Sequence, residues 1–255
     1  MKTIKKYLSL VLVALFAFTA CSLEGQSNNE ATENKTETSE TAENTSTDGK
    51  MKVGVSLSTL NNPFFVSIRE GIEEGAGEDV ETVISDAQND SSTQSNQVED
   101  LITQGVDLII INPVDSTAIA PSVEKANEAN IPVICVDRGT DSGEIVSFIA
   151  SNNVEGGKMA GEFILEKVGE NAEVIQLEGI PGASSTRERG EGFKEATDGK
   201  INLLASQTAN FDRAEGLTVM ENLLQAHPDV KAVFCQNDEM ALGASDCLLY
   251  TSPSP

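Results

Sequence analysis

From residue 51 onwards, short apolar segments alternate with longer segments in which apolar residues recur at helical spacing. The segment at 108–111 is apolar without interruption, as expected for a strand buried on both faces. Strands that alternate with helices form parallel sheets covered on both faces, so the sequence predicts an α/β protein. The predicted strands are 52–58, 81–87, 108–112, 133–137, 144–150, 172–177, 202–207 and 232–236, and the predicted helices are 63–76, 93–104, 116–130, 153–168, 184–197 and 212–226.

The chain has 255 residues, which is enough for two ordinary domains, and it is strongly acidic. Its 17 Lys and Arg residues face 41 Asp and Glu residues, giving a formal net charge of −24. A surface of this charge repels nucleic acids and anionic membranes. We therefore expect no nucleic-acid partner and favour a neutral ligand.

The N-terminus has the pattern of a bacterial lipoprotein signal peptide. Lysines precede an apolar stretch at 8–20, which is too short for a permanent transmembrane helix, and Cys21 follows it. Cleavage before Cys21 would leave that cysteine to carry lipid, although Phe18 stands where such signals usually have Leu. Residues 22–49 are polar and acidic. We predict a signal peptide and lipobox at 1–21, a disordered acidic tether at 22–49, and a protein anchored on the outer face of the cell membrane.

The remaining cysteines are Cys135, Cys235 and Cys247, and their spacing matches no metal-binding motif. The single histidine, His227, precedes a proline at the end of a predicted helix. We expect no metal and no cofactor. Because Cys135 and Cys235 lie within apolar segments, we interpret them as buried thiols rather than as a disulfide.

Ligands of parallel sheets bind beyond the carboxyl ends of the strands, where this chain places polar and aromatic residues. The first strand is followed by Ser58 and then by Asn62, Pro63, Phe64 and Phe65. Aromatic rings stack on the C–H faces of sugars, and amides bind sugar hydroxyls. The same residues could instead start a helix, with Asn62 as its cap and the phenylalanines in the core.

Charged side chains follow the fourth predicted strand, and more candidates follow the later ones. Asp137 ends the segment 133–137 and Arg138 follows it, and fixed charges there would form strong hydrogen bonds to hydroxyl groups. Arg189, Phe211 and Asn237 follow later strands. Each of these residues could alternatively cap a helix or lie in a solvated turn.

Motifs of the common enzyme classes are missing from the sequence. The first strand is not followed by GxGxxG, and the glycine-rich segment 179–184 lacks the lysine of a P-loop, so we interpret it as a turn ending in a helix cap. There is also no GxSxG motif. Asp137 and Asp238 could together act on a glycosidic bond, but sequence spacing does not give their separation. We predict a protein that is not an enzyme and has no catalytic residues.

Several of these segments, taken together, resemble the bacterial D-ribose-binding proteins, a family with the type I periplasmic binding-protein fold. The matching segments are 58–65, 131–138, 187–193, 211–213 and 236–244, and the similarity extends from about residue 51 to 244. The resemblance implies two Rossmann-like lobes with parallel sheets, joined by a hinge, with an N-terminal lobe at 50–152 and a C-terminal lobe at 153–246. It further implies that a sugar lies between the lobes and that the ligand-binding residues are Ser58, Asn62, Phe64, Phe65, Asp137, Arg138, Arg189, Phe211 and Asn237.

The same resemblance implies a function in transport. The ligand would be D-ribose or a closely related monosaccharide such as allose, delivered unchanged to an ABC permease and, in some relatives, presented to a chemoreceptor. We expect a monomer that contacts the membrane only through its lipid. The sugar-sensing domains of LacI-type repressors are the alternative, but they follow a helix-turn-helix and stay in the cytoplasm, whereas this chain begins with an export signal.

The C-terminal segment departs from the family pattern. We expect the helical pattern to break after Ala244, and residues 247–255 can be encoded by the sequence of a common transposase sequencing adapter. We therefore predict a non-native tail at 247–255 and a C-terminal lobe that is incomplete, lacking two family ligand contacts, an Asp and a Gln. A genuine disordered tail is the alternative.

Overall fold

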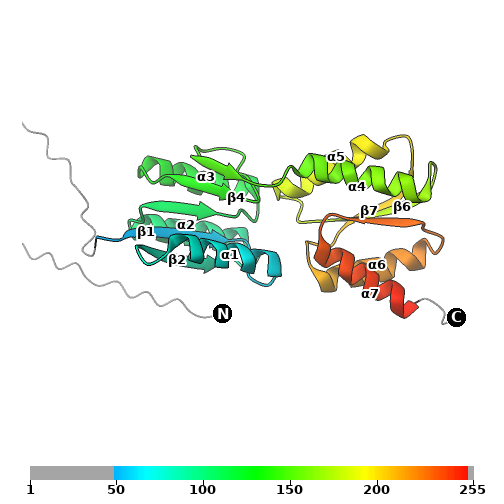
Figure 1. Cartoon of the computed structure of the whole chain (residues 1–255), viewed down its shortest axis with the longest axis horizontal. Helices are drawn as coiled ribbons and strands as arrows, with labels where there is room; N and C mark the ends of the chain where they lie inside the picture. Colours follow the sequence, from blue (N-terminus) through cyan, green and yellow to red (C-terminus); the bar gives the residue numbers. More distant parts are fainter. Residues whose placement is uncertain (1–48, 252–255) are drawn as a thin grey trace, which may run out of the picture. The chain divides into compact units, whose positions relative to one another are not determined.

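The computed structural model describes residues 49–251, which form two parallel sheets with their helices (Figure 1). The predicted signal peptide, Cys21 and nearly all of the predicted tether lie outside the described residues. Among residues 49–251, every helix is too short or too polar to cross a bilayer.

The first sheet has five parallel strands in the order β2-β1-β3-β4-β5. Three helices accompany it, and only the connection from β4 to β5 lacks one. The elements are β1 (Met51–Leu57), α1 (Pro63–Ala76), β2 (Val80–Asp86), α2 (Ser91–Thr103), β3 (Leu108–Ile111), α3 (Ser116–Glu128), β4 (Val133–Val136) and β5 (Ser147–Ile149).

The alternation of side chains along β1 explains how helices cover both faces of this sheet. Val53 and Val55 belong to a buried cluster with the apolar side of α1. Gly54 and Ser56 point to the opposite face, where α2 packs so closely that a Cβ atom on Gly54 would lie 2.8 Å from the side chain of Leu101. The carboxyl end of β1 therefore brings polar groups against α2.

The second sheet has three parallel strands in the order β7-β6-β8. Helices α4 and α5 lie on one face, and α6 and α7 lie on the other (Figure 1). The elements are α4 (Asn153–Val168), β6 (Glu173–Glu178), α5 (Ser184–Thr197), β7 (Asn202–Thr208), α6 (Arg213–Ala226), β8 (Ala232–Cys235) and α7 (Asp238–Thr251).

Glycines bring α4 and α5 into backbone contact. A Cβ atom on Gly157 of α4 would lie 2.1 Å from the carbonyl oxygen of Arg189, and one on Gly192 of α5 would lie 1.8 Å from the carbonyl oxygen of Val154. Larger side chains at these positions would force the helices apart. The close approach fixes where α5 places Arg189.

Polar contacts join the loop after β4 to the beginning of α5. Ser184 accepts a hydrogen bond at its hydroxyl from the Gly139 N–H (3.0 Å), and Arg187 lies 3.0 Å from the Asp141 carboxylate. The segment 179–184 is a turn that ends at the N-cap of α5, as predicted, but the N-cap residue is Ala183, which provides no side-chain hydrogen bond. The Ser184 hydroxyl instead connects the loop after β4 of the first sheet to the start of α5, which packs on the second sheet.

The predicted break after Ala244 is also wrong, because α7 continues to Thr251. Met240, Ala244 and Cys247 recur at helical spacing and are all buried in the core between α6, α7 and the second sheet. Asp246, which makes the sequence look irregular here, points outward and pairs with Arg213 at 2.9 Å. The non-native origin of residues 247–255 stays a prediction.

Cys135 and Cys235 are unpaired thiols, as predicted. Cys135 is fully buried, and burial raises its pKa to about 11. Cys235 is half-buried, and burial raises its pKa to about 12.

Candidate functional site

A cleft of about 640 Å³ is lined by residues from the helices and loops that accompany each of the two sheets. This volume is typical of small-molecule sites. Eight of the nine predicted ligand-binding residues line it, namely Asn62, Phe64, Phe65, Asp137, Arg138, Arg189, Phe211 and Asn237. Ser58 is the ninth, and it lies behind the cleft, fully buried.

The start of α1 supplies one wall of the cleft, and the predicted helix start is confirmed there, with Phe65 but not Phe64 in the core. Asn62 caps the helix by accepting a hydrogen bond from the Phe64 N–H (2.9 Å), and Pro63 occupies the first turn. The Phe65 ring is core, with 3% of its surface exposed, whereas the Phe64 ring is 54% exposed. The two rings pack edge to face, 5.3 Å apart, so the helix start presents an aromatic surface to the cleft.

The turn after β4 presents the two charged groups. Asp137 has a φ of 64°, in the left-handed region that Asp tolerates better than most residues. Its N–H donates to the Ile149 carbonyl (2.8 Å), and the Arg138 N–H donates to the Val136 carbonyl (2.7 Å). This tight turn brings both side chains to the cleft immediately beyond the sheet.

Arg138 is the most deeply buried cation of the cleft, with 2% of its surface exposed. Its guanidinium lies 5.1 Å from the ring centroids of Phe65 and of Phe211, a geometry that favours cation–π attraction. Burial lowers the pKa of Arg138 to about 10, although Asp137 opposes the change. The group therefore stays a cation at neutral pH.

Asp137 provides a buried carboxylate beside two arginines. Its Oδ2 lies 3.6 Å from the Arg138 Nε, an ion pair longer than a hydrogen bond. Burial raises the pKa of Asp137, and the charges of Arg138 and Arg189 and a hydrogen bond from Asn112 act in the opposite direction.

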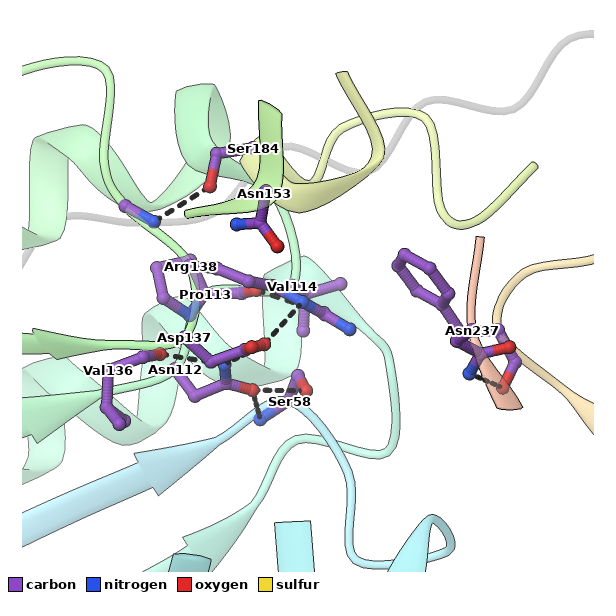
Figure 2. Close-up of polar contacts among 12 residues, drawn as sticks. Ser58, Asn112, Pro113, Val114, Val136, Asp137, Arg138, Asn153, Ser184 and Asn237 are labelled. Atoms are coloured by element: carbon purple, nitrogen blue, oxygen red, sulfur yellow. Dashed lines mark hydrogen bonds and ion pairs between the residues drawn. The ribbon is translucent and has the colours of Figure 1, made fainter. Parts of the chain in front are cut away.

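A buried amide joins Asp137 to Ser58 (Figure 2). Asn112 accepts a hydrogen bond at Oδ1 from the Ser58 hydroxyl (2.5 Å) and donates from Nδ2 to the Val136 carbonyl (3.0 Å) and to Asp137 (3.5 Å). The Ser58 hydroxyl is thus directed at Asn112 and not at the cleft.

The second sheet contributes Arg189 and Phe211. Arg189 donates from Nε to the Asn153 side-chain oxygen (3.0 Å) and from Nη1 to the Gln236 carbonyl (2.6 Å). Phe211 has a φ of 60°, and its ring lies against Gly179 and 5.8 Å from the Arg189 guanidinium. Arg189 is therefore held on two sides, with the ring of Phe211 next to it.

Asn237 caps α7 much as Asn62 caps α1. Its Oδ1 accepts a hydrogen bond from the Met240 N–H (2.9 Å). Its Nδ2 donates to the Phe211 carbonyl (3.2 Å), which is the dashed line at Asn237 in Figure 2. Both asparagines line the cleft while their side-chain oxygens cap helices, and each amide nitrogen carries two N–H donors. The cleft thus has N–H donors from Asn62, Arg138, Arg189 and Asn237.

The sequence analysis did not assign a role to three buried polar residues around these groups, Asn112, Asn153 and Gln236. Gln236 accepts a hydrogen bond from the Gly179 N–H (2.9 Å) and so fixes the loop beneath Phe211. Asn112 and Gln236 directly follow strands, which is the signal that could have identified them. Asn153 lies at the start of α4, a few residues after β5, and so carries a weaker signal of the same kind.

These groups suit a hydroxylated ligand, because aromatic surface and ionic hydrogen-bonding groups line the same cleft. Among the described residues, no cluster of three His, Cys, Asp or Glu side chains could hold a metal ion.

Comparison with known proteins gives relatives along nearly the whole chain. The chain is 50% identical to the ribose import binding protein of Bacillus subtilis over 246 residues, which covers 96% of this chain and 77% of that protein. It is 54% identical to the ribose import binding protein of Escherichia coli over 197 residues, or 76% of this chain and 67% of that protein.

Solved structures have the same fold. The myo-inositol binding protein of Caulobacter, bound to myo-inositol, superposes with a TM-score of 0.75 at 32% identity, covering 78% of this chain and 70% of that one. Residues 53–249 match the family model described as a periplasmic binding protein domain. The α/β fold with two parallel sheets is therefore confirmed, and the chain belongs to the family of periplasmic binding proteins.

Proposed function

We propose that this protein is the extracytoplasmic binding component of a sugar importer and that it binds D-ribose, or a closely related monosaccharide, in the cleft. The observation that carries the proposal is the convergence of three phenylalanine rings and two arginines, drawn from the segments of both sheets, on one cavity. The high identity to two ribose import binding proteins supports the choice of sugar.

The physical basis of binding is the match between the cleft and a sugar ring. In this proposal the rings of Phe64, Phe65 and Phe211 remove water from the apolar C–H faces of the ring. Arg138 and Arg189 donate to the sugar oxygens, and Asp137 accepts from a sugar hydroxyl. Ser58, the ninth residue of the proposed site, acts through Asn112.

Closure of the two lobes around the sugar follows from the origin of these residues. We place the lobes at 50–152 and 153–246, so that Asp137 and Arg138 belong to the first lobe and Arg189 and Phe211 to the second. A ligand shifts an open–closed equilibrium only by its difference in affinity for the two states. A sugar that contacts both lobes at once favours the closed form.

The proposal includes the partners and the location. The closed, loaded form would dock on an ABC permease, and a chemoreceptor is a second candidate partner. We propose a monomer, exported and held on the outer face of the membrane by lipid on Cys21. Cys21→Ala should abolish the incorporation of labelled palmitate, whereas the unchanged protein should incorporate it and stay with the membranes after a salt wash.

We propose binding without catalysis. Asp137 lies beside Arg138 and Arg189, and the proposal assigns its carboxylate to accept a hydrogen bond from a sugar hydroxyl. A repressor-type sugar sensor is disfavoured by the export signal. Labelled ribose incubated with the protein should be recovered unchanged, and the appearance of a product would contradict the proposal.

The decisive experiment is calorimetric titration of the full chain with D-ribose, D-allose, D-galactose and D-xylose. We expect ribose to bind most tightly. Arg189→Ala should weaken ribose binding by about tenfold or more, because it removes a charged donor from the cleft. Lys194→Ala is the matched control, since Lys194 lies on the same helix, exposed, and outside the cleft lining. A well-folded protein that binds none of the four sugars would refute the proposal.

A further inference from the structure

A buried glutamine fixes the segment that follows β3. Gln94 of α2 has 1% of its surface exposed, and its side chain makes two good hydrogen bonds to this segment. Its Nε2 donates to the Asn112 carbonyl (2.9 Å), and its Oε1 accepts from the Val114 N–H (2.8 Å). Gln94 therefore holds both ends of residues 112–114.

The same three residues hold both charged groups of the turn after β4 (Figure 2). The Asn112 Nδ2 donates to Asp137 (3.5 Å), and the Pro113 carbonyl accepts from the Arg138 Nη1 (3.2 Å). Any shift of the segment 112–114 would move the partners of the carboxylate and of the guanidinium together.

Ser58 determines which way the Asn112 amide points. The Oδ1 of Asn112 accepts from both the hydroxyl (2.5 Å) and the N–H (3.3 Å) of Ser58. An amide turned the other way would place its two N–H groups against these two donors. The Nδ2 of Asn112 is thereby directed at Asp137.

We propose that Gln94 and Asn112 are positioning residues for ligand binding, which orient Asp137 and Arg138 and favour the ionised form of Asp137. This inference rests on the sugar-binding function proposed above. Both residues lie outside the lining of the cleft, and in this inference they determine the positions of the two charged groups within it. Binding groups fixed before the ligand arrives lose less free energy on binding.

A second glutamine on α2 provides a matched control. Gln97 lies one turn further along, its Nε2 donates to the Asp86 carbonyl (2.8 Å), and its Oε1 accepts from the Ser56 hydroxyl (3.1 Å). These bonds resemble those of Gln94 in number and kind, but they join β1 and β2 and do not reach 112–114. Loss of Gln97 should therefore affect stability alone.

The first test compares Gln94→Met with Gln97→Met, which both keep the side-chain length and remove the hydrogen bonds. We expect Gln94→Met to weaken D-ribose binding by about fivefold to a hundredfold, the range for a lost buried hydrogen bond. Gln97→Met should change the affinity by less than about twofold, while both lower the unfolding temperature. Equal losses of affinity in the two proteins would overturn the inference.

The second test uses the ionisation of Asp137, which a purely structural role would not change. The charged groups around Asp137 are Arg138 from its own turn and Arg189 from α5. Asn112→Asp would put a second carboxylate in place of the Nδ2 donor, and two adjacent carboxylates raise each other's pKa. We expect the pKa of Asp137 to rise, and the pH below which ribose binding is lost to rise with it.

The titration is followed by NMR of protein labelled at the aspartate carboxyl carbons, with Asp137→Asn to assign the signal. Because it is measured without sugar, this result stands apart from the question of whether ribose is the ligand. If Asn112→Asp does not fold, Gln94→Met gives the same readout, since a displaced Asn112 donates less well to Asp137. An unchanged Asp137 midpoint in a folded Gln94→Met protein would contradict the inference.

Discussion

The ring of Phe211 fills the space beside Gly179, where a Cβ atom would lie 2.0 Å from the Phe211 Cζ. Gly179→Ala must therefore displace the ring, and through it the aromatic wall next to Arg138 and Arg189. We expect ribose affinity to fall by about tenfold or more, as for a lost stacking contact with added strain. Calorimetry would measure the loss. Gly71→Ala, on the open surface of α1, is the control and should leave affinity unchanged.

The two phenylalanines at the start of α1 should separate binding from stability. Phe65 is buried, so Phe65→Ala should lower the free energy of unfolding by about 3 kcal/mol as well as weaken ribose binding. Phe64 is half-exposed, so Phe64→Ala should weaken binding while changing stability by less than about 1 kcal/mol. Urea unfolding and calorimetry on both variants test this, and a large loss of stability in Phe64→Ala would contradict it.

Much of the fold could be predicted from the sequence. The residues that are apolar at strand or helix spacing are also the residues that pack in the core. Helices α1, α4 and α5 have the predicted bounds, and all eight predicted strands are present within three residues at either end. Helix α7 was missed, because the pair Ser245 and Asp246 interrupts the pattern although both lie away from its buried face. Local composition does not reveal which side of a helix a polar pair occupies.

The candidate site was predicted less completely. Residues that line the cleft follow strands or start helices, and they carry a local signal. The role of Ser58 could not be predicted, because its hydroxyl is directed by Asn112, a residue far away in the sequence. Gln94 has no signal at all, since a glutamine within a helix is usually a surface residue. Contacts of this kind depend on the tertiary structure.

Protonation of Asp137 should make stability depend on pH. Burial raises the pKa of Asp137 above its ordinary value of 3.8, so the native state binds this proton more tightly than the unfolded state does. The resulting stabilisation is complete below the ordinary pKa and is lost as the pH rises through the raised pKa. Relative to Asp137→Asn, the free energy of unfolding should therefore decrease from about pH 4 upward. Urea unfolding at several pH values measures this difference, and an increase with pH would show that the arginines outweigh burial.

The thiols of Cys135 and Cys235 should be unreactive in the native protein. Burial raises the pKa of Cys135 to about 11 and that of Cys235 to about 12, so almost no thiolate is present at pH 8. We expect an alkylating reagent to modify neither residue at pH 8 until the protein is unfolded in urea. Mass spectrometry of digested samples identifies the modified sites. Rapid labelling of Cys135 in the native state would show that β4 opens locally.

Helix capping by Asn62 and Asn237 has a consequence for discrimination between related ligands. Since the backbone of α1 and of α7 occupies both side-chain oxygens, neither amide can rotate to offer its oxygen without uncapping its helix. In the proposed complex, a protonated amino group in place of a hydroxyl would meet N–H donors at these two asparagines, whereas beside Asp137 it would meet a carboxylate. Amino sugars whose amino group falls at either asparagine should therefore be rejected, and this selectivity would originate in the first turns of two helices.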